Sequence, residues 1–404
     1  MTDGSEPLDR PSGGALDGLI VLDLSRILAG PTATQLLGDL GATVIKIEHP
    51  TRGDDTRQWG PPFAPGAGDL SAYFMAANRN KRSLGIDMTD PEGQALLRQL
   101  VGRADVVIEN FKPGGLEKYG LDHGTLRAAY PGLVYCSISG FGQTGPNRDK
   151  PGYDLMAQGY AGIMALTGEP EGQPMKVAVG IADVMTGMYA AVGILAALRH
   201  RDRTGEGQHI DLSLVDSTVS WLVNEGTAHL STGQDRPRRG NGHPTIVPYQ
   251  VFAVADGHVI VAVGNDGQYR RFCDYLARPE LADDPRFATN PARLEHRDTL
   301  VPILAKALAT HTKAEVIGGL ETRQVPVGPV NTLPEVFATD QVAARDMAPR
   351  LPRSGTDTGA VQLLGNPLKL SVTPVTYRRP PPRLGEDTQT ILDWLRPDAD
   401  IPKP

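Results

Sequence analysis

One aspartate stands out because its surroundings are apolar. Asp183 ends the stretch VAVGIAD (residues 177–183), and residues 187–201, rich in Ala, Leu, Ile and Met, predict a well-buried helix directly after it. A carboxylate in such a position can cap the helix by accepting hydrogen bonds from its first N–H groups. It can also stay ionised, because the helix dipole stabilises an anion, and act as a nucleophile. The residues alone leave both interpretations open.

Asp154 and a glycine-bearing basic loop are further candidates. Asp154 ends the turn-like stretch PGYD (residues 151–154), where it could start a helix or face a cleft. Residues 238–244, RRGNGHP, could be a surface hairpin loop. Alternatively, this loop is a lid whose glycines let the backbone approach a ligand closely.

Positive charges are concentrated in NRNKRS (residues 78–83), although the net charge of the chain is −7. A charge run is usually a solvated surface. Together with Lys46, Arg52 and Arg57, however, this run could line a pocket for an anion such as a phosphate or a carboxylate. The residues that we expect to gather around an anionic cofactor are Lys46, Arg79, Lys81 and Arg82.

Other chemistry is disfavoured by composition. The histidines are scattered without an HExxH motif, and the two cysteines, Cys136 and Cys273, cannot form a cysteine zinc site or a disulfide framework, so we expect no metal. No GxSxG elbow surrounds a serine, and Ser137 and Ser139 alternate on a predicted strand. The acidic balance argues against a nucleic-acid partner. We also expect no membrane span, because the apolar stretches fall short of about 18 residues. The polar N-terminus does not resemble a signal peptide, and we therefore expect a cytoplasmic protein.

Alternating strands and helices must position these residues. Apolar strands are predicted at 19–24, 43–48, 105–109 and 133–139, with helical segments at 34–40 and 91–101 between them. Asp90 and Pro91 are a good N-cap and first residue for the second helix. This order predicts a doubly wound α/β domain of Rossmann-like architecture. No GxGxxG follows the first strand, so binding of NAD is not supported.

Changes in composition and residue pattern along the chain indicate domain boundaries. We expect a flexible tail at 1–15, a large Rossmann-like domain at 16–200 and a linker at 201–226. A small α+β domain follows at 227–330, where residues 249–263 alternate around Asp256-Gly257 as in a hairpin. The rest, 331–404, contains many prolines and one short helix near 388–395.

Several motifs together resemble the family III CoA-transferases, which include formyl-CoA transferase and carnitine CoA-transferase. The resemblance runs from Leu16 nearly to Leu395. Its most specific stretches are VLDLSRILAGP (21–31), LGDLGATVIKIEHP (37–50), GDDTR (53–57), NRNKRSLGIDM (78–88), ADVVIENFKPG (104–114), SGFGQTGP (139–146), KPGYDLMAQ (150–158), GIADVMTGMYAAVGILAAL (180–198) and RTGEGQHIDLSL (203–214).

The resemblance implies that Asp183 is a catalytic nucleophile that attacks an acyl-CoA thioester, giving a mixed anhydride and then an aspartyl-CoA thioester. It also implies CoA, or acyl-CoA, as a substrate and no tightly bound cofactor. The residues that match the family's CoA contacts are Leu28, Ala29, His49, Ile86, Asn110, Phe111, Lys118, Tyr119, Lys150, Tyr153 and Asp154. The residues that match its glycine-rich substrate loop are Gly240, Asn241, Gly242 and His243.

The family fold implied is a large and a small domain with a C-terminal segment that returns to the large one. The chain then forms an open ring, and two rings interlock as a homodimer. The chain departs from formyl-CoA transferase at Leu28 and His49, where that enzyme has Gln and Arg, so a formyl or oxalate substrate is in doubt. The stretch GNGHPTIVPYQ (240–250) resembles members that act on dicarboxylates, and Arg238, Arg239 and His243 could bind a second carboxylate.

Two other functions fit the same scaffold. An α-methylacyl-CoA racemase would use Asp154 as a base, but such enzymes typically have GHDxNY where this chain has Gly152-Tyr153-Asp154. A non-catalytic acyl-CoA-binding protein is the other alternative. The partners expected in every case are an acyl-CoA and, for the transferase, a small carboxylic acid.

Overall fold

The computed structural model describes Leu8 and residues 13–396. Contacts divide the chain into two compact units. Unit 1 contains the chain up to Ile163, then Lys176–Thr232, and the C-terminal part from Ala343; unit 2 contains Met164–Met175 and Gly233–Val342. Most of the predicted tail, 1–15, lies outside the described residues.

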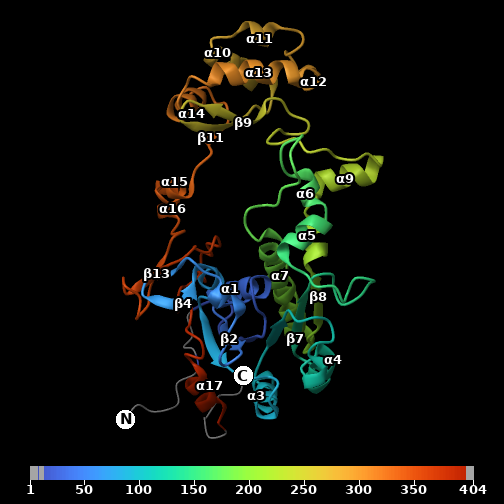
Figure 1. Cartoon of the computed structure of the whole chain (residues 1–404), viewed down its shortest axis with the longest axis vertical. Coiled ribbons are helices and arrows are strands. Elements are labelled where there is room, and N and C mark those ends of the chain that lie inside the picture. The colour runs from blue at the N-terminus through green and yellow to red at the C-terminus, as the bar shows by residue number, and fades with distance from the viewer. Residues whose placement is uncertain (1–7, 9–12, 397–404) are drawn as a thin grey trace. The chain divides into compact units, whose positions relative to one another are not determined.

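A six-stranded parallel sheet forms the centre of unit 1 (Figure 1). Its order is β5-β2-β1-β6-β7-β8, and each neighbouring pair is parallel. The strands are β1 (Ile20–Asp23), β2 (Thr43–Glu48), β5 (Lys81–Gly85), β6 (Val106–Glu109), β7 (Val134–Ser139) and β8 (His209–Ser213). By position along the chain this is the order 3-2-1-4-5-6 of a Rossmann sheet, so the predicted α/β class with a central parallel sheet is confirmed.

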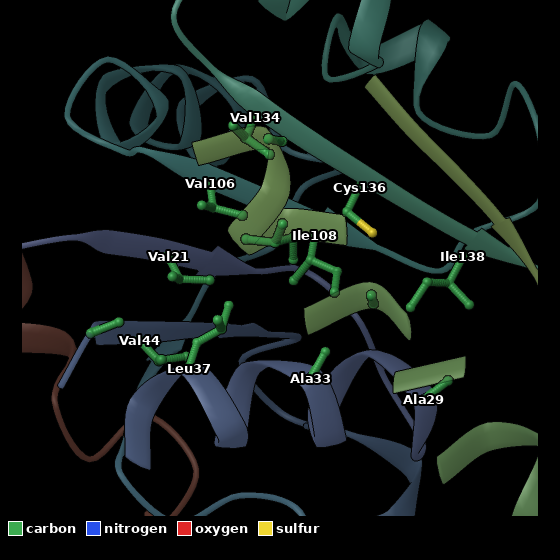
Figure 2. Close-up of a cluster of buried hydrophobic side chains, with 14 of the residues drawn as sticks. Val21, Ala29, Ala33, Leu37, Val44, Val106, Ile108, Val134, Cys136 and Ile138 are labelled. Carbon is green, nitrogen blue, oxygen red and sulfur yellow. The ribbon is translucent and has the colours of Figure 1, made fainter. Parts of the chain in front are cut away.

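Helices cover both faces of this sheet because successive strand residues point to opposite sides. On one face, Val21, Val106 and Ile108 pack against α1 (Ala29–Asp39) and α7 (Ile181–Thr204), as Figure 2 shows for the α1 side. On the other face, Leu22 and Val107 belong to a second core. This core includes residues of α3 (Pro91–Val101), α4 (His123–Ala129) and α17 (Thr388–Leu395).

Strand β5 is the strand of the central sheet that we did not predict from the sequence. Its residues KRSLG include Lys81 and Arg82, which hid it within a polar run. Both cations are instead paired with carboxylates of other elements: Lys81 lies 3.0 Å from Asp23, and Arg82 lies 2.9 Å from Asp387. Charge pairing in the folded chain therefore replaces the apolar pattern that normally predicts a buried parallel strand.

The C-terminal segment of unit 1 is tied to β5 and to the residues just before it. The Asn80 carboxamide accepts hydrogen bonds from the backbone N–H groups of Arg378 and Arg379 at 2.8 and 3.0 Å. Asp387 accepts from the Ser83 N–H at 3.0 Å. A stretch around residues 366–395 thus packs on the first part of unit 1, although about 300 residues separate them in the chain.

Residues 201–226, which the sequence indicated as a linker, are regular structure of unit 1. They contain the end of α7, strand β8, helix α8 (Leu214–Ser220) and the start of α9 (Val223–Thr232). The apolar side chains of β8 lie at the edge of the sheet, where β8 pairs with β7. Gly205 ends α7, and it adopts the left-handed conformation common after a helix, with a φ of +76°.

Unit 2 is a small α+β body. Strands β9 (Tyr249–Val254) and β10 (Gly257–Ala262) form the predicted antiparallel hairpin, and β11 (Val327–Pro329) pairs with β10. Its helices include α10 (Asp266–Tyr275), α13 (Arg297–Leu308) and α14 (Lys313–Glu321), which bury Phe272, Leu304 and Leu320 around one core.

Helix α7 is long and apolar enough to cross a membrane by length and composition alone, with a mean hydropathy of 1.8 over its most apolar window. Our expectation that the apolar stretches are too short for a span is therefore wrong for this helix. In the structure it packs on α1, and Gly187 permits the close approach because a Cβ there would lie 2.5 Å from the Ala29 carbonyl oxygen. The opposite side of α7 exposes Met188, Tyr189 and Val192.

Candidate active site

Two adjoining cavities lie at the carboxyl ends of β1 and β6. These strands are neighbours, and the strand order reverses between them, which is where open α/β sheets bind ligands. The cavities are lined by the loop after β1, residues 24–29, and by the loop after β6, residues 110–115. They share Arg26, Asp55, Phe111 and Gly115, so they lie side by side, and we call the two cavities together the trough.

The first cavity, of about 270 Å³, brings together many of the predicted CoA contacts. His49, Ile86, Phe111, Lys118 and Tyr119 all line it. Arg26 and Arg52 line it as well and add positive charge to an otherwise mixed wall. Sequence reasoning did not assign Arg26 to the site, although it lies within the matched stretch VLDLSRILAGP.

The second cavity, of about 420 Å³, contains the candidate nucleophile. The predicted residues that line it are Ala29, Asn110, Phe111, Lys150, Tyr153 and Asp183. Lys112 also lines it, and sequence reasoning did not single it out. Leu28, Arg82 and Asp154 are not among the lining residues of either cavity.

Asp183 is the third residue of α7 and is 9% exposed. The N-cap of α7 is Gly180, so the interpretation of Asp183 as the helix cap is wrong. Burial and the negative charge of Asp154 both disfavour the ionised form and raise the pKa of Asp183 to about 7. A carboxylate with so little solvation is a stronger nucleophile than one in water.

Asp154 performs the capping that the sequence suggested for Asp183. It is the first residue of α5 (Asp154–Tyr160), and its Oδ1 accepts from the Ala182 N–H at 2.8 Å and the Asp183 N–H at 3.5 Å. Its Oδ2 accepts from the Gln158 amide at 2.7 Å. Oδ1 therefore holds the start of α7 and Oδ2 is engaged by a residue of α5, so Asp154 is placed to position Asp183 rather than to remove a substrate proton.

Tyr73 is a further residue near the nucleophile that sequence reasoning missed. It belongs to the short helix α2 (Ala72–Ala76) and packs edge-on against Trp59, with ring centroids 5.0 Å apart. Burial and the negative charges of Asp183 and Asp154 raise the pKa of the Tyr73 hydroxyl. No local sequence signal marked it, because residues 72–76 carry no motif of their own.

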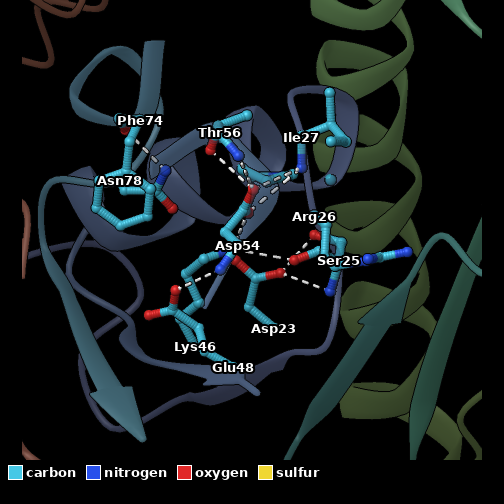
Figure 3. A network of polar contacts seen from close by, with 12 residues as sticks. Asp23, Ser25, Arg26, Ile27, Lys46, Glu48, Asp54, Thr56, Phe74 and Asn78 are labelled. Atoms are coloured by element: carbon cyan, nitrogen blue, oxygen red, sulfur yellow. Dashed lines mark hydrogen bonds and ion pairs between the residues drawn. The ribbon is translucent and has the colours of Figure 1, made fainter. Parts of the chain in front are cut away.

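The expected pocket of gathered cations is wrong. Lys46, Arg79 and Lys81 are buried and Arg82 is mostly covered, and each is paired with a carboxylate rather than facing an open cavity; Figure 3 shows Lys46 beside Asp54. These pairs are Lys46–Asp54 at 2.8 Å, Arg79–Asp39 at 2.5 Å, Lys81–Asp23 at 3.0 Å and Arg82–Asp387 at 2.9 Å. Buried charges are nearly always paired, because an isolated ion in the protein interior is costly.

Ser137, which we interpreted as structural, lies inside β7 in a polar group with Glu109, the last residue of β6, and His209, the first residue of β8. Its hydroxyl is 3.0 Å from His209 Nε2. Burial raises the pKa of Glu109 to about 7, and the Glu109 carboxylate accepts from the Phe111 N–H at 2.7 Å. No group of three or more metal-ligating side chains occurs among the described residues.

The predicted substrate loop, Gly240–His243, belongs to unit 2. The Gly240 N–H donates to the Gly168 carbonyl at 3.0 Å, and the His243 N–H donates to the Tyr249 carbonyl at 2.9 Å. Arg238 donates to the carbonyls of Glu169 and Gly172, so its guanidinium supports the backbone. Asn241 and Gly242 line a separate cavity within unit 2.

Two arginines face that cavity of unit 2. Arg239 and Arg297 both line it, and burial together with the charge of Arg239 lowers the pKa of Arg297. Arg297 also donates to the His243 carbonyl at 2.5 Å, and Gly242 makes room for it, since a Cβ there would lie 2.9 Å from Arg297 Nη1. Arg297 lies 54 residues beyond the loop and has no motif that could have indicated this role.

Comparisons with known proteins show which family this chain belongs to. The family model described as CoA-transferase family III matches residues 16–388. The chain is 49% identical to the succinate–glutarate CoA-transferase of Agrobacterium fabrum, over 94% of this chain and 95% of that protein. It is 39% identical to the mouse succinyl-CoA:glutarate CoA-transferase, over 96% and 88% of the two chains.

A solved structure, that of a CAIB/BAIF family protein from Brucella suis, superposes with a TM-score of 0.87. It is 47% identical and covers 95% of this chain and all of that one. The match to the family model and the identity to named CoA-transferases both extend over nearly the whole chain, including the loops that line the trough. The chain therefore belongs to CoA-transferase family III.

Proposed function

We propose that this enzyme transfers CoA from succinyl-CoA to a dicarboxylic acid such as glutarate through a covalent intermediate on Asp183. The observation that supports the mechanism is the position of Asp183: a buried carboxylate in the wall of a cavity that adjoins the cavity with many of the predicted CoA contacts. A nucleophile so placed can meet a thioester carbonyl while the rest of CoA extends along the trough.

The exchange has four balanced steps. An Asp183 oxygen attacks the thioester carbonyl, the C–S bond breaks, and a mixed anhydride and CoA thiolate form. The thiolate attacks the Asp183 carbonyl of the anhydride, which releases the donor acid as its carboxylate and leaves an aspartyl-CoA thioester. The acceptor carboxylate attacks that thioester and expels the thiolate, giving a second anhydride. The thiolate then attacks the acceptor's acyl carbon, which forms the new acyl-CoA and regenerates the Asp183 carboxylate.

The charges along the trough support binding of an anionic CoA. Arg52, Lys118 and His49 line the first cavity, where the phosphates and nucleotide would lie. Lys112 and Lys150 line the second cavity, together with Arg26, which belongs to both. Positive groups near the thioester would favour the thiolate that leaves and returns.

A dicarboxylate substrate is supported by the named activities of the similar enzymes, which include a succinate–glutarate CoA-transferase and a succinyl-CoA:glutarate CoA-transferase.

We also propose that two chains form the homodimer that the family resemblance implies. The exposed apolar side of α7 supports this, since Val192 is 64% exposed and Met188 and Tyr189 lie beside it on the same helix. Light scattering on the full chain should give twice the chain mass. Val192→Asp should weaken association, whereas a monomeric wild type would contradict the proposal.

Intact-protein mass spectrometry tests the mechanism directly. Wild-type enzyme incubated with succinyl-CoA should gain the mass of CoA less one water, on the peptide that contains Asp183, and hydroxylamine should remove it. A panel of acids that includes glutarate, oxalate, butyrate and pentanoate then defines the acceptor. A racemase would instead exchange the α-hydrogen of a methylacyl-CoA for deuterium without any acceptor acid, and absence of the adduct would exclude the covalent mechanism.

A further inference from the structure

The loop between β1 and α1 contains a strained residue at the start of the active site. Ile27 has a φ of +71°, in the left-handed region that β-branched residues rarely adopt. Such a conformation costs of order 1–2 kcal/mol, so other contacts must hold it in place. The strain is at the point where the strand order of the sheet reverses.

A buried ion pair supplies these contacts, as Figure 3 shows. The Ile27 N–H lies 3.3 Å from each oxygen of the Asp54 carboxylate. Asp54 is fixed in turn by Lys46 Nζ at 2.8 Å and by the Thr56 hydroxyl at 2.7 Å. Lys46 Nζ also donates to the Ser25 carbonyl at 3.0 Å, so the pair Asp54–Lys46 contacts the backbone on both sides of Arg26.

The neighbouring residue is held from the opposite side. The Arg26 N–H donates to the Asn110 side-chain oxygen at 2.9 Å, and the Asn110 amide donates to the Arg26 carbonyl at 2.7 Å. Three successive residues, from Ser25 to Ile27, thus have their backbone groups bound by side chains from other elements. The left-handed turn is imposed by tertiary contacts and not by the local sequence.

This turn determines how the next residues meet the nucleophile's helix. Leu28 Cδ2 lies so near Gly180 that a Cβ at position 180 would be 2.9 Å from it. Gly180 is the N-cap of α7, three residues before Asp183. Ala29, the first residue of α1, lines the cavity together with Asp183. A change at Ile27 would therefore move both Leu28 and Ala29 against the start of α7.

We propose that Asp54 and Lys46 are positioning residues for the transfer reaction: they hold Ile27 in its left-handed conformation, so that Leu28 and Ala29 form the wall of the cavity around Asp183. The inference rests on the proposed function, because it holds that the loop serves to place Asp183 as the nucleophile. Asp54 does not contact the reacting atoms, which are an Asp183 oxygen and the thioester carbon, and it acts through the loop.

The test is a double-mutant cycle between positions 54 and 27. Asp54→Asn weakens the hold on the Ile27 N–H, and we expect kcat to fall about 10- to 100-fold, as misplaced catalytic groups usually cause. Glycine adopts positive φ without strain, so in an Ile27→Gly background the same Asp54→Asn change should cost less than about threefold. Ile27→Val keeps the β-branched penalty and should leave the full loss.

A control separates positioning from general stability. Asp39→Asn breaks another buried pair, with Arg79, and should lower the melting temperature while Ile27→Gly gives no rescue of it. Equal losses of kcat in the glycine and isoleucine backgrounds would overturn the proposal, as would equal rescue of Asp39→Asn. If Asp54→Asn does not fold, Asp54→Ser replaces it, because a serine N-cap still accepts from the Thr56 N–H but lacks the two oxygens that face Ile27.

The same samples distinguish failure of this inference from failure of the proposed function. Each variant is incubated with succinyl-CoA and analysed for the CoA adduct on Asp183. A wild type without adduct refutes the covalent mechanism. If the wild type forms the adduct, but Asp54→Asn slows its formation equally in the Ile27 and Ile27→Gly backgrounds, only the role of Asp54 is refuted.

Discussion

Asp54 and Asp183 are both buried carboxylates in the walls of the trough, yet their pKa values shift in opposite directions. Lys46 and hydrogen bonds from Thr56 overcome the cost of burial at Asp54 and lower its pKa to about 2. Asp183 has a second carboxylate, Asp154, for its neighbour, and its pKa rises to about 7. Burial is common to both residues, so the sign of the neighbouring charge decides which one is poised for chemistry.

The largest effect should come from removing the poised carboxylate. Asp183→Asn should lower the rate of CoA exchange by at least about 10³-fold, since loss of a covalent nucleophile leaves only binding and electrostatic contributions. The rate is measured by chromatography of succinyl-CoA and the product thioester. Retention of more than a tenth of wild-type activity would mean that another group attacks the thioester.

The same variant tests the cost of burying Asp183. Because its pKa is raised, the folded protein binds this proton more tightly than the unfolded chain between about pH 4 and pH 7. The free energy of unfolding of the wild type should therefore decrease relative to Asp183→Asn as the pH rises through this window. Urea denaturation of both proteins at pH 4.5 and pH 8 measures the difference, and a constant difference would contradict the raised pKa.

Breaking the structural pair should affect stability next most strongly. Lys46→Met leaves Asp54 buried without its cation, and we expect the free energy of unfolding to fall by about 3–5 kcal/mol at pH 7. The pKa of Asp54 is lowered, so the stability it contributes is present above about pH 4 and is lost as the pH falls toward 2. The difference from wild type should shrink over that range. Lys306→Met, on the exposed side of α13, is the control and should change stability by less than about 0.5 kcal/mol.

Removing the charge of Asp154, the neighbour of Asp183, should lower the pKa of Asp183 and so bring it nearer to that of Asp54. In the wild type, kcat/KM should rise with pH through an apparent pKa of about 7, because the nucleophile must be ionised. Asp154→Asn removes the negative charge, so this limb should move to lower pH. Asp149→Asn, an exposed position, serves as the reference and should leave the limb in place.

The smallest effect should be at the residue beside Asp54 in the chain. Asp55 pairs with Arg26 at 3.0 Å, but both side chains are about half exposed. Exposed pairs contribute little, so Asp55→Asn should change the free energy of unfolding by at most about 0.5 kcal/mol. If Asp55→Asn lowered the free energy of unfolding nearly as much as Lys46→Met does, burial would not explain the difference between Asp54 and Asp55.

Much of the fold was predictable because it depends on local patterns. Strand β2 and helix α3 have the predicted bounds, and the hairpin β9–β10 turns at the predicted Asp256-Gly257. Strand β5 was not predictable, since its polar residues satisfy no strand pattern until Asp23 and Asp387 are brought beside them. Residues 201–226 were assigned to a linker, although residues 209–214 alternate as a strand does, because the pairing of β8 with the sheet edge is a tertiary relation.

For the site, the matched motifs led to Asp183 and most residues of the two cavities. The charge run led to a wrong expectation for the cations, because a cluster of Lys and Arg in sequence does not reveal whether it faces a ligand or a buried carboxylate. The residues alone also left open whether Asp183 caps α7, a role that the structure gives to Asp154. Which of two aspartates caps α7 depends on where α5 places its first residue, and that is a tertiary relation.

The sequence by itself determined the α/β class, the family motifs and the identity of the candidate nucleophile, because strand and helix periodicity and turn residues act over short distances. Only the tertiary structure decided the charge state of each buried acid and the left-handed turn at Ile27. Both depend on groups from separate segments, such as Asp54 after β2 and Ile27 after β1, that meet at the carboxyl edge of the sheet. Electrostatic energies in a protein interior are determined by such neighbours in space, which no local pattern contains.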